Sequence, residues 1–179
     1  MKMKFLFLSE IKNEQIISFL LKKGKVDWEK EKLSLERASQ YDWIISFGYR
    51  HIISQQIIDA SKIPIINLHI SYLPFNRGAH PNYWSFKENT PKGVSIHFID
   101  TGIDTGPILI QKKCNFSRTD TLATSYLKLK SEIEKLFYAS FHKIITHEII
   151  ATSQTSQGTF HKKSDLPDGI DWNININDI

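Results

Sequence analysis

The sequence predicts an α/β protein in which a mostly parallel, Rossmann-like sheet is flanked by helices. Over the first seventy residues, short apolar runs typical of buried strands alternate with segments of helical spacing. This alternation is typical of parallel strands joined by crossover helices. The length of 179 residues suits one domain with a substantial core. The 41% of hydrophobic and 23% of charged residues are ordinary for a globular chain.

Each predicted element rests on a pattern of its own. Apolar runs predict five strands, at residues 4–9, 42–47, 63–70, 93–100 and 107–113. In the fourth run, Val94, Ile96 and Phe98 lie on one face, opposite Ser95, His97 and Ile99. Three segments predict helices, at residues 13–24, 54–61 and 121–150. Gly24 is expected to end the first helix, and Ser54 to cap the second.

The chain is expected to form a single domain. Residues 1–150 make its core, and residues 151–179 make a closing segment that begins with a polar connector around Gly158. The final stretch, "DGIDWNININDI", looks like the lead-in to another element. We therefore expect the chain to be shorter than the fold from which it comes.

Composition excludes several classes of function. The net charge of +4 is a mild excess, and without a dense Lys/Arg block it does not favour nucleic acid as a partner. The single cysteine, Cys114, excludes an internal disulfide, and no Cys/His spacing indicates zinc. The apolar run near the amino terminus is too short for a signal peptide, and no run is long enough to cross a bilayer. A cytoplasmic location without a membrane partner is the expectation.

The first group of candidate functional residues lies around the third predicted strand. Asn67 and His69 are two positions apart, so they share one side of the strand. They come at its carboxyl end, where ligands bind in parallel α/β sheets. The following loop contains turn-forming residues and four side chains suited to anionic or hydroxyl groups, Asn76, Arg77, His80 and Asn82.

The second group follows the fourth strand in "HFIDTGIDTGPILIQ". Asp100 and Asp104 stand here with Gly102 and Gly106, a density of glycine that suggests tight turns or a closely approaching ligand. A carboxylate in this loop could reach a histidine on a neighbouring strand end, raise its pKa and orient its ring. Simpler interpretations also exist. The Asn–His pair could satisfy backbone groups in a bend, and the two acids could hold only their own turns.

The residues that carry these two groups resemble one family. "NLHISYLPFNRG" and "GVSIHFIDTGIDTGPILIQ" together resemble the motifs of the folate-dependent formyltransferases, in the same order and at the same spacing. That family includes glycinamide ribonucleotide transformylase, methionyl-tRNA formyltransferase and the sugar N-formyltransferases. "SFGYRHII" is similar to the segment whose backbone lines the family's pterin pocket, and "GTFHKKSDLPDGIDW" resembles the piece that closes its catalytic domain.

The resemblance implies a formyltransferase fold, with 10-formyltetrahydrofolate as formyl donor and no metal. Asn67, His69 and Asp104 would form the catalytic triad, with the strand ends near His69 and Phe98 side by side. Asn67 and a protonated His69 would stabilise the negative charge on the formyl oxygen, and Asp104 would help transfer a proton. The implied folate contacts are Phe47, Gly48, Tyr49, Arg50, His51, Ile52, Ile53, Asp100, Thr101, Gly102 and Ile103.

The acceptor is expected to be the amine of a nucleotide-linked deoxyamino sugar, such as a dTDP-4-amino-4,6-dideoxyhexose. The stretch "FLFLSEIKNEQ" lacks the glycine-rich phosphate loop of the glycinamide ribonucleotide enzyme, and the tRNA enzyme carries an additional carboxyl-terminal domain. Asn76, Arg77, His80 and Asn82 are the candidate acceptor contacts. Methionyl-tRNA or glycinamide ribonucleotide as acceptor, hydrolysis of the donor, and a non-catalytic folate or nucleotide-sugar binding module are the alternatives. A homodimer is possible within this family.

Overall fold

The computed structural model of the protein describes residues 2–179. Six strands form the main sheet in the order β2-β1-β3-β4-β6-β7. Their bounds are β1 Met3–Leu8, β2 Gly24–Glu29, β3 Trp43–Ser46, β4 Ile66–His69, β6 Gly93–Phe98 and β7 Ile108–Lys113. The helices are α1 Glu14–Leu21, α2 Leu35–Ala38, α3 Gln55–Ala60, α4 Pro81–Lys87 and α5 Leu122–Ile145. A second, two-stranded sheet pairs β5 Arg77–Gly78 with β8 Phe160–His161, and a 3₁₀ turn follows at Lys163–Asp165.

The main sheet is parallel in its first four strands and antiparallel at its far edge. β2, β1, β3 and β4 run in one direction, whereas β6 and β7 pair antiparallel to their neighbours. The predicted mostly parallel α/β fold is therefore confirmed. The predicted juxtaposition of the strand ends at His69 and Phe98 is wrong, because the antiparallel register sets Phe98 opposite Ile66 and His69 opposite Ser95.

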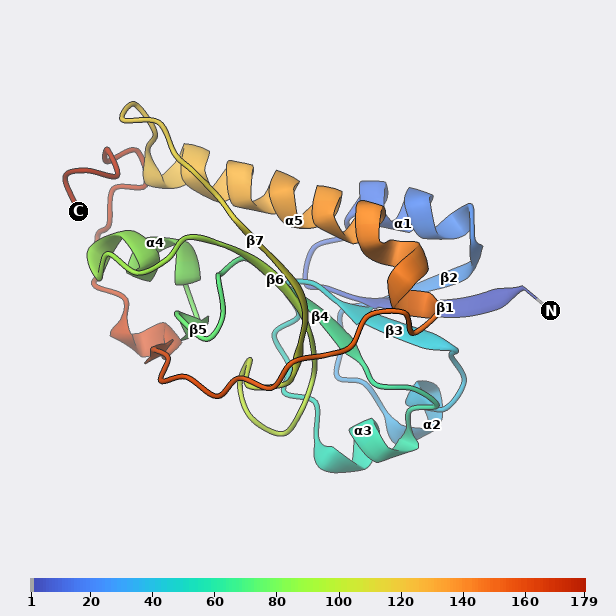
Figure 1. Ribbon diagram of the computed structural model, residues 1–179. Coiled ribbons are helices and arrows are strands. Elements are labelled where there is room, and N and C mark those ends of the chain that lie inside the picture. The colour runs from blue at the N-terminus through green and yellow to red at the C-terminus, as the bar shows by residue number, and fades with distance from the viewer. Residues whose placement is uncertain (1) are drawn as a thin grey trace.

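Helices cover both faces of the sheet, so its central strands are buried on two sides. α1 and α5 lie over one face, and α2 and α3 over the other (Figure 1). Strand β1 shows how burial on both faces determines the residue pattern of a strand. Phe5 and Phe7 pack in the cluster under α1 and α5, and Leu6 and Leu8 pack in the cluster beside α2 and α3. Burial on both faces explains why this strand reads as a continuous apolar run.

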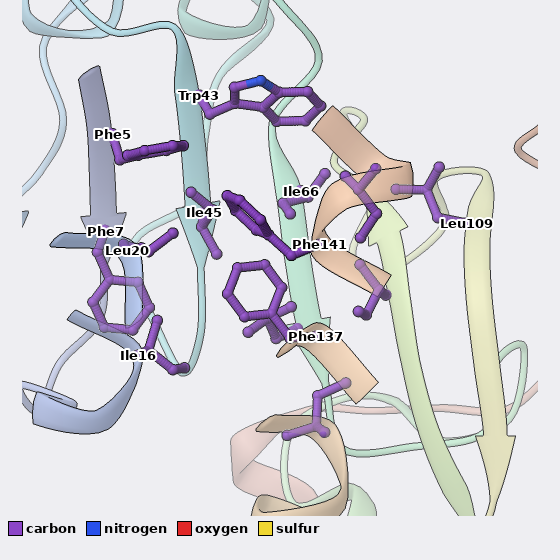
Figure 2. Packing of buried hydrophobic residues seen from close by; sticks show 14 of the residues in the cluster. Phe5, Phe7, Ile16, Leu20, Trp43, Ile45, Ile66, Leu109, Phe137 and Phe141 are labelled. Atoms are coloured by element: carbon purple, nitrogen blue, oxygen red, sulfur yellow. The ribbon is translucent and has the colours of Figure 1, made fainter. Parts of the chain in front are cut away.

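Helix α5 supplies much of the larger core. Thr121 and Thr124 form a capping box at its start, which satisfies backbone N–H groups that have no partner within the helix. Phe137 and Phe141 point from the helix toward the strands (Figure 2), and their rings meet edge to face at 5.6 Å. The helix ends at Ile145 rather than at the predicted residue 150, because His147 adopts a left-handed conformation with φ 55°.

Several other elements differ from the sequence prediction. Gly24 follows the first helix, as predicted, but it also begins β2. A side chain at this position would collide with the carbonyl oxygen of Met3. Strand β2 was missed because it is an edge strand in which no residue is fully buried. Helix α4 was also missed, inside a segment interpreted as a loop. Ser54 stands at the cap position of α3, but its side chain makes no capping hydrogen bond.

Residues 151–179 return across the molecule and contact it at several places. Thr152 bridges to Ile108 at the start of β7, and β8 pairs with β5. At the start of α5, the N–H groups of Leu122 and Ala123 donate to the carbonyls of Ile174 and Trp172. In Figure 1 this last part lies next to the first turn of α5. Across residues 2–179 no helix has the length and apolarity needed to span a membrane.

Replacing Phe137 by Ala should show how much α5 contributes to stability. Phe137 is fully buried, so its truncation removes apolar contacts and leaves a cavity. We expect the free energy of unfolding to fall by about 3–5 kcal/mol. Leu127→Ala on the same helix is the matched control, since Leu127 is 62% exposed, and its change should stay within about 0.5 kcal/mol. Chemical denaturation measures both, and equal effects would contradict the assignment of the core.

Candidate active site

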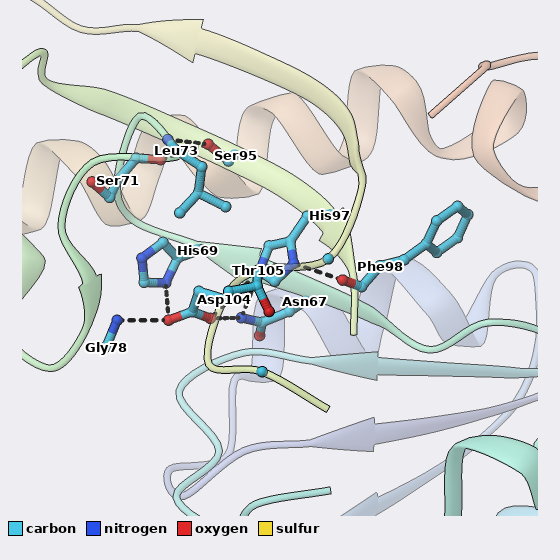
Figure 3. Close-up of polar contacts among 12 residues, drawn as sticks. Asn67, His69, Ser71, Leu73, Gly78, Ser95, His97, Phe98, Asp104 and Thr105 are labelled. Carbon is cyan, nitrogen blue, oxygen red and sulfur yellow. Dashed lines mark hydrogen bonds and ion pairs between the residues drawn. The ribbon is translucent and has the colours of Figure 1, made fainter. Parts of the chain in front are cut away.

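Asp104 is the centre of a buried polar cluster on the face of the sheet opposite α5. One carboxylate oxygen, Oδ1, accepts a hydrogen bond from Asn67 Nδ2 at 3.2 Å and lies 3.5 Å from His97 Nε2. The other, Oδ2, accepts from the backbone N–H of Gly78 at 2.9 Å and lies 3.7 Å from His69 Nδ1. Figure 3 shows the carboxylate between these four groups. The predicted meeting of Asn67, His69 and Asp104 is thus what the structure shows.

The sheet register explains how the side chains come to share one face. Ile66 and Leu68 on β4 point into the core under α5, so Asn67 and His69 point to the other side. Because β6 runs antiparallel to β4, His97 stands directly opposite Asn67. Cross-strand partners on one face are close neighbours. The antiparallel pairing therefore adds a second histidine to the cluster, which the sequence analysis did not include.

The loop after β6 holds Asp104 in place through bonds along its whole length. Asp100 accepts hydrogen bonds from the Gly102 N–H at 3.1 Å and from the Thr105 hydroxyl at 2.6 Å. Gln154 Nε2 donates to the carbonyls of Asp104 and Gly106 at 2.9 and 2.8 Å. Asp104 itself has φ 53°, a conformation that costs a non-glycine residue energy and persists only under such restraint. Of the two acids, Asp100 forms the turn, as the simpler interpretation proposed, and Asp104 enters the cluster.

The cluster perturbs both of its main titratable groups. Burial alone would raise the pKa of Asp104, but His69, His97 and the Gly78 N–H together hold the pKa of this carboxyl well below its ordinary value. Burial lowers the pKa of His69, and the charge of Asp104 only partly offsets this. The nearby carboxylate does act to raise the pKa of His69, as expected, but desolvation outweighs its charge and the net shift is downward. An ionised Asp104 beside a neutral His69 is the state that follows near neutral pH.

Hydrogen-bond partners assign the tautomers of the two histidines. His69 Nε2 lies 3.3 Å from the carbonyl oxygen of Asn76, which can only accept, so this nitrogen carries the proton. The unprotonated Nδ1 then faces Asp104. His97 Nδ1 lies 2.7 Å from the carbonyl of Phe98 and donates to it. His97 Nε2 is left to accept from Asn67 Nδ2 at 3.2 Å.

Two acceptors, His97 Nε2 and Asp104 Oδ1, lie within hydrogen-bond distance of the Asn67 amide nitrogen. They are 3.5 Å apart, and each is 3.2 Å from Nδ2. The amide can bond each with a separate N–H, or it can share one N–H between both. Sharing leaves the second N–H for a ligand. Asn67 is one of the residues lining the neighbouring cavity.

A cavity of about 700 Å³ opens beside Asn67 and Asp104. Its walls include Gly48, Tyr49, Arg50, His51, Ile52 and Ile53 after β3, and Asp100, Gly102 and Ile103 after β6. These are the segments expected to contact folate, although Phe47 and Thr101 are not among the lining residues. The volume falls in the range of pockets for ligands of drug size. Gly48 has φ +63° and open space beside its Cα, so a ligand can approach its backbone closely.

The four candidate acceptor contacts have different positions. His80 lines the cavity. Asn76 and Asn82 are only 0% and 3% exposed, and their amides are used inside the fold. Asn76 bonds with Thr90 and Thr159, and Asn82 bonds with Leu122 and Ser125. Arg77 lies in β5 with its Nε buried and without a hydrogen-bond partner, and no ion pair with Asp100 or Asp104 forms.

Sequence reasoning missed several residues at this site. His97 was noted only as a member of an alternating strand. Gly78 bonds Asp104 through its backbone N–H, and the Gln154 side chain bonds the backbone carbonyl of Asp104. Contacts with backbone groups leave no signal in a single sequence. His161, Lys162 and Lys163 line the cavity from the closing segment. Among residues 2–179, no group of three or more His, Cys, Asp or Glu side chains is arranged to hold a metal ion.

Comparison with known proteins identifies one family over most of the chain. Residues 9–141 match the sequence model of the Formyl transferase family. The dTDP-4-amino-4,6-dideoxyglucose formyltransferase of Mycobacterium tuberculosis strain H37Rv is 29% identical over 131 residues, which are 73% of this chain and 55% of that protein. The methionyl-tRNA formyltransferase of Thermodesulfovibrio yellowstonii is 34% identical over 134 residues, covering 74% and 44%. The chain therefore spans about half the length of these curated relatives.

One solved structure is similar over nearly its entire length. The formyltransferase PseJ from Anoxybacillus kamchatkensis has a TM-score of 0.89 and 40% sequence identity to this chain. The similarity covers 97% of this chain and 95% of PseJ. That crystal structure contains UDP-4,6-dideoxy-4-formamido-L-AltNAc and tetrahydrofolate.

The lowered pKa of His69 predicts a specific loss of stability in mild acid. In the unfolded chain the ring titrates at its ordinary value, so below that pH the unfolded state binds more protons than the folded state. The stabilising contribution of the neutral ring is present above the unfolded-state pKa and is lost as the pH falls toward the folded-state pKa. We expect the Tm of the wild type to fall more steeply between about pH 7.5 and about pH 5.5 than that of His69→Asn.

The control for this measurement is His142→Asn, because His142 lies on α5 with its side chain 79% exposed. Its Tm should follow the wild-type slope. A slope in His69→Asn as steep as that of the wild type would contradict burial as the dominant influence on His69.

Proposed function

Because the chain belongs to the formyl transferase family, with its residues 9–141 matching the family model, we propose that it transfers a formyl group from 10-formyltetrahydrofolate to the amine of a nucleotide-linked deoxyamino sugar. The observation that carries this proposal is the Asn67–Asp104–His69 cluster at the wall of a cavity lined by residues 48–53, 99, 100 and 102–104. The chemistry of formyl transfer needs a hydrogen-bond donor for the formyl oxygen and an acceptor for the proton of the amine.

The geometry supports the following roles for the residues. The amine nitrogen attacks the formyl carbon, and negative charge develops on the formyl oxygen. With one N–H shared between His97 and Asp104, the second N–H of Asn67 can donate to this oxygen. The amine must lose a proton while the folate nitrogen N10 gains one. A proton that reaches Nδ1 of His69 is held against Asp104 Oδ2, 3.7 Å away, which stabilises the imidazolium while the C–N10 bond breaks. His69 thus acts from its neutral state as a base, rather than as the resting cation expected from the sequence.

The formyl donor fits the large cavity by chemistry and by size. Two glycine-containing turns, at Gly48 and at Gly102, face it with backbone groups. Ile52, Ile53, Ile99 and Ile103 add apolar walls, which suit the rings of a pterin. Backbone recognition predicts that folate binding is insensitive to truncation of Arg50 or His51.

The nature of the acceptor is supported by the similarity to PseJ. A formamido sugar and tetrahydrofolate, both present in that crystal structure, are the two molecules that formyl transfer to an amino sugar leaves behind. Because this chain spans 95% of PseJ, the same class of acceptor is the one we propose here. Homodimer formation and a cytoplasmic location stay predictions from the sequence.

Formyl transfer is tested directly with 10-formyltetrahydrofolate and a panel of UDP- and dTDP-linked amino sugars. We expect release of tetrahydrofolate together with one formylated sugar, detected by mass. Asn67→Ala removes the donor to the formyl oxygen and should lower kcat by about 10²–10³-fold. Asn173→Ala is the matched control, since Asn173 is exposed and far along the chain from the cluster.

Each other outcome points to a specific alternative. Tetrahydrofolate release without a formylated sugar would indicate hydrolysis of the donor. Formylation of methionyl-tRNA but of no sugar would replace the proposed acceptor. A kcat of Asn67→Ala equal to that of Asn173→Ala would contradict the role of Asn67.

A further inference from the structure

A second, smaller cavity of about 330 Å³ lies next to the first. The two cavities share His80 and Tyr126 among their lining residues, so a ligand that leaves the Asp104 cluster past His80 enters the second one. His80 is at the start of α4 in a left-handed conformation with φ 53°. Gly78 and Ala79 directly precede His80 and line the first cavity. The backbone N–H of Gly78 donates to Asp104.

The walls of the small cavity are aromatic and apolar. Tyr83, Tyr126 and Trp172 line it together with Ile70 and Pro81. Tyr126 and Trp172 are 46% and 41% exposed, although both are large rings. Exposed rings that line an apolar cavity offer flat surfaces on which a planar group can stack. The remaining lining residues, His80 and Asn82, provide few polar groups, and the amide of Asn82 is already bonded.

Trp172 is held in place by backbone hydrogen bonds. The first N–H groups of a helix have no partners within it. In α5 the N–H of Ala123 donates to the carbonyl of Trp172 at 2.8 Å, and that of Leu122 donates to Ile174 at 3.1 Å. Asn175 also bridges to Thr121. The segment of Trp172 is therefore tied to the first turn of the helix that supplies Tyr126.

Positive charge lies along the boundary between the cavities. Lys162 and Lys163 line the larger cavity just beyond β8. Lys163 is close enough to His80 that its charge adds to the effect of burial in lowering the pKa of His80. Neither lysine has an ion-pair partner among residues 2–179. Asp165 lies nearby, but its carboxylate accepts hydrogen bonds from the Lys162 N–H and Ser164 hydroxyl.

We propose that the small cavity binds the base of a nucleoside diphosphate between Tyr126 and Trp172, with Lys163 beside its diphosphate. The order of features matches the order of groups in a nucleotide-linked amino sugar. The amine belongs at Asn67 and Asp104, the sugar passes Gly78 and His80, the diphosphate meets the lysine, and the base occupies the aromatic cavity. This inference rests on the proposed function for the identity of the attached sugar, but the nucleotide subsite is testable without it.

UDP is the first probe, because it lacks an amine and cannot be formylated. Isothermal titration calorimetry on the full chain gives the Kd for UDP and for 5-formyltetrahydrofolate. Trp172→Ala should weaken UDP binding at least about tenfold by loss of base stacking, with Trp172→Phe in between. Leu127→Ala, next to Tyr126 on α5 and 62% exposed, should leave UDP binding unchanged. None of these variants should change the Kd of the folate.

The lysine is tested in the same assay. Lys163→Ala should weaken UDP binding more than it weakens uridine binding, because uridine lacks the diphosphate. Lys143→Ala, which removes an exposed charge from α5, is the matched control. If Lys163→Ala weakens the folate and spares UDP, the lysine serves the donor and its assignment here is overturned.

The outcomes separate this inference from the proposed function. UDP binding by Trp172→Ala equal to that of Leu127→Ala overturns the subsite, even where formyl transfer to a sugar occurs. An equal loss of UDP and folate binding in Trp172→Ala also overturns it, because it shows a structural role. Absence of binding by UDP, dTDP, ADP and GDP to the wild type does the same. Selective loss of UDP binding supports the subsite, even where no amino sugar is formylated.

Discussion

The buried carboxylate of Asp104 connects parts of the chain that the sheet alone does not bring together. Its two oxygens contact Asn67 on β4, His97 on β6, His69 at the end of β4 and the backbone at Gly78. A buried charge is tolerated only where such partners compensate for its lost hydration. The loop at residues 74–80 and strands β4 and β6 are thus coupled through one charge, and the closing segment reaches the same residue through the bond from Gln154 to its backbone carbonyl. The walls of the large cavity depend on the same contacts.

The restraint on Asp104 also defines its chemistry. Its left-handed backbone and the bonds from Gln154 fix the carboxylate before any ligand arrives. A preorganised charge does not have to reorient during a reaction, which is the main source of electrostatic catalysis. The His69 ring behind it faces the carboxylate with Nδ1, and the His97–Asn67 contact holds an amide that lines the cavity. Each polar group in the cluster therefore has a structural partner, and the proposed formyl transfer would use the arrangement as it stands.

The sequence predicted the parts of this site that depend on local pattern. Asn67 and His69 share a face because strands alternate, and the glycine-rich loop marks two acids, of which only the family resemblance singled out Asp104. The role of His97 could not be predicted in the same way, because it depends on β6 running antiparallel to β4. An apolar run gives no information about the direction of its neighbour. Strand β2 was missed for a related reason, since a partly exposed edge strand lacks the continuous apolar character of the buried ones. The effect of the carboxylate on the pKa of His69 was predicted correctly, but the larger opposite effect of burial was not, because burial is a property of the whole fold.

The most direct measurement of this arrangement is the titration of Asp104 by NMR, following its side-chain carboxyl carbon from neutral pH into acid. A short unstructured peptide that contains one aspartate, measured in the same buffers, serves as the reference. The four contacts predict that the Asp104 signal stays at its ionised position through the pH range in which the peptide aspartate titrates, because the pKa of Asp104 is held well below the ordinary value. A titration step of Asp104 that coincides with that of the peptide would contradict the central role of this carboxylate.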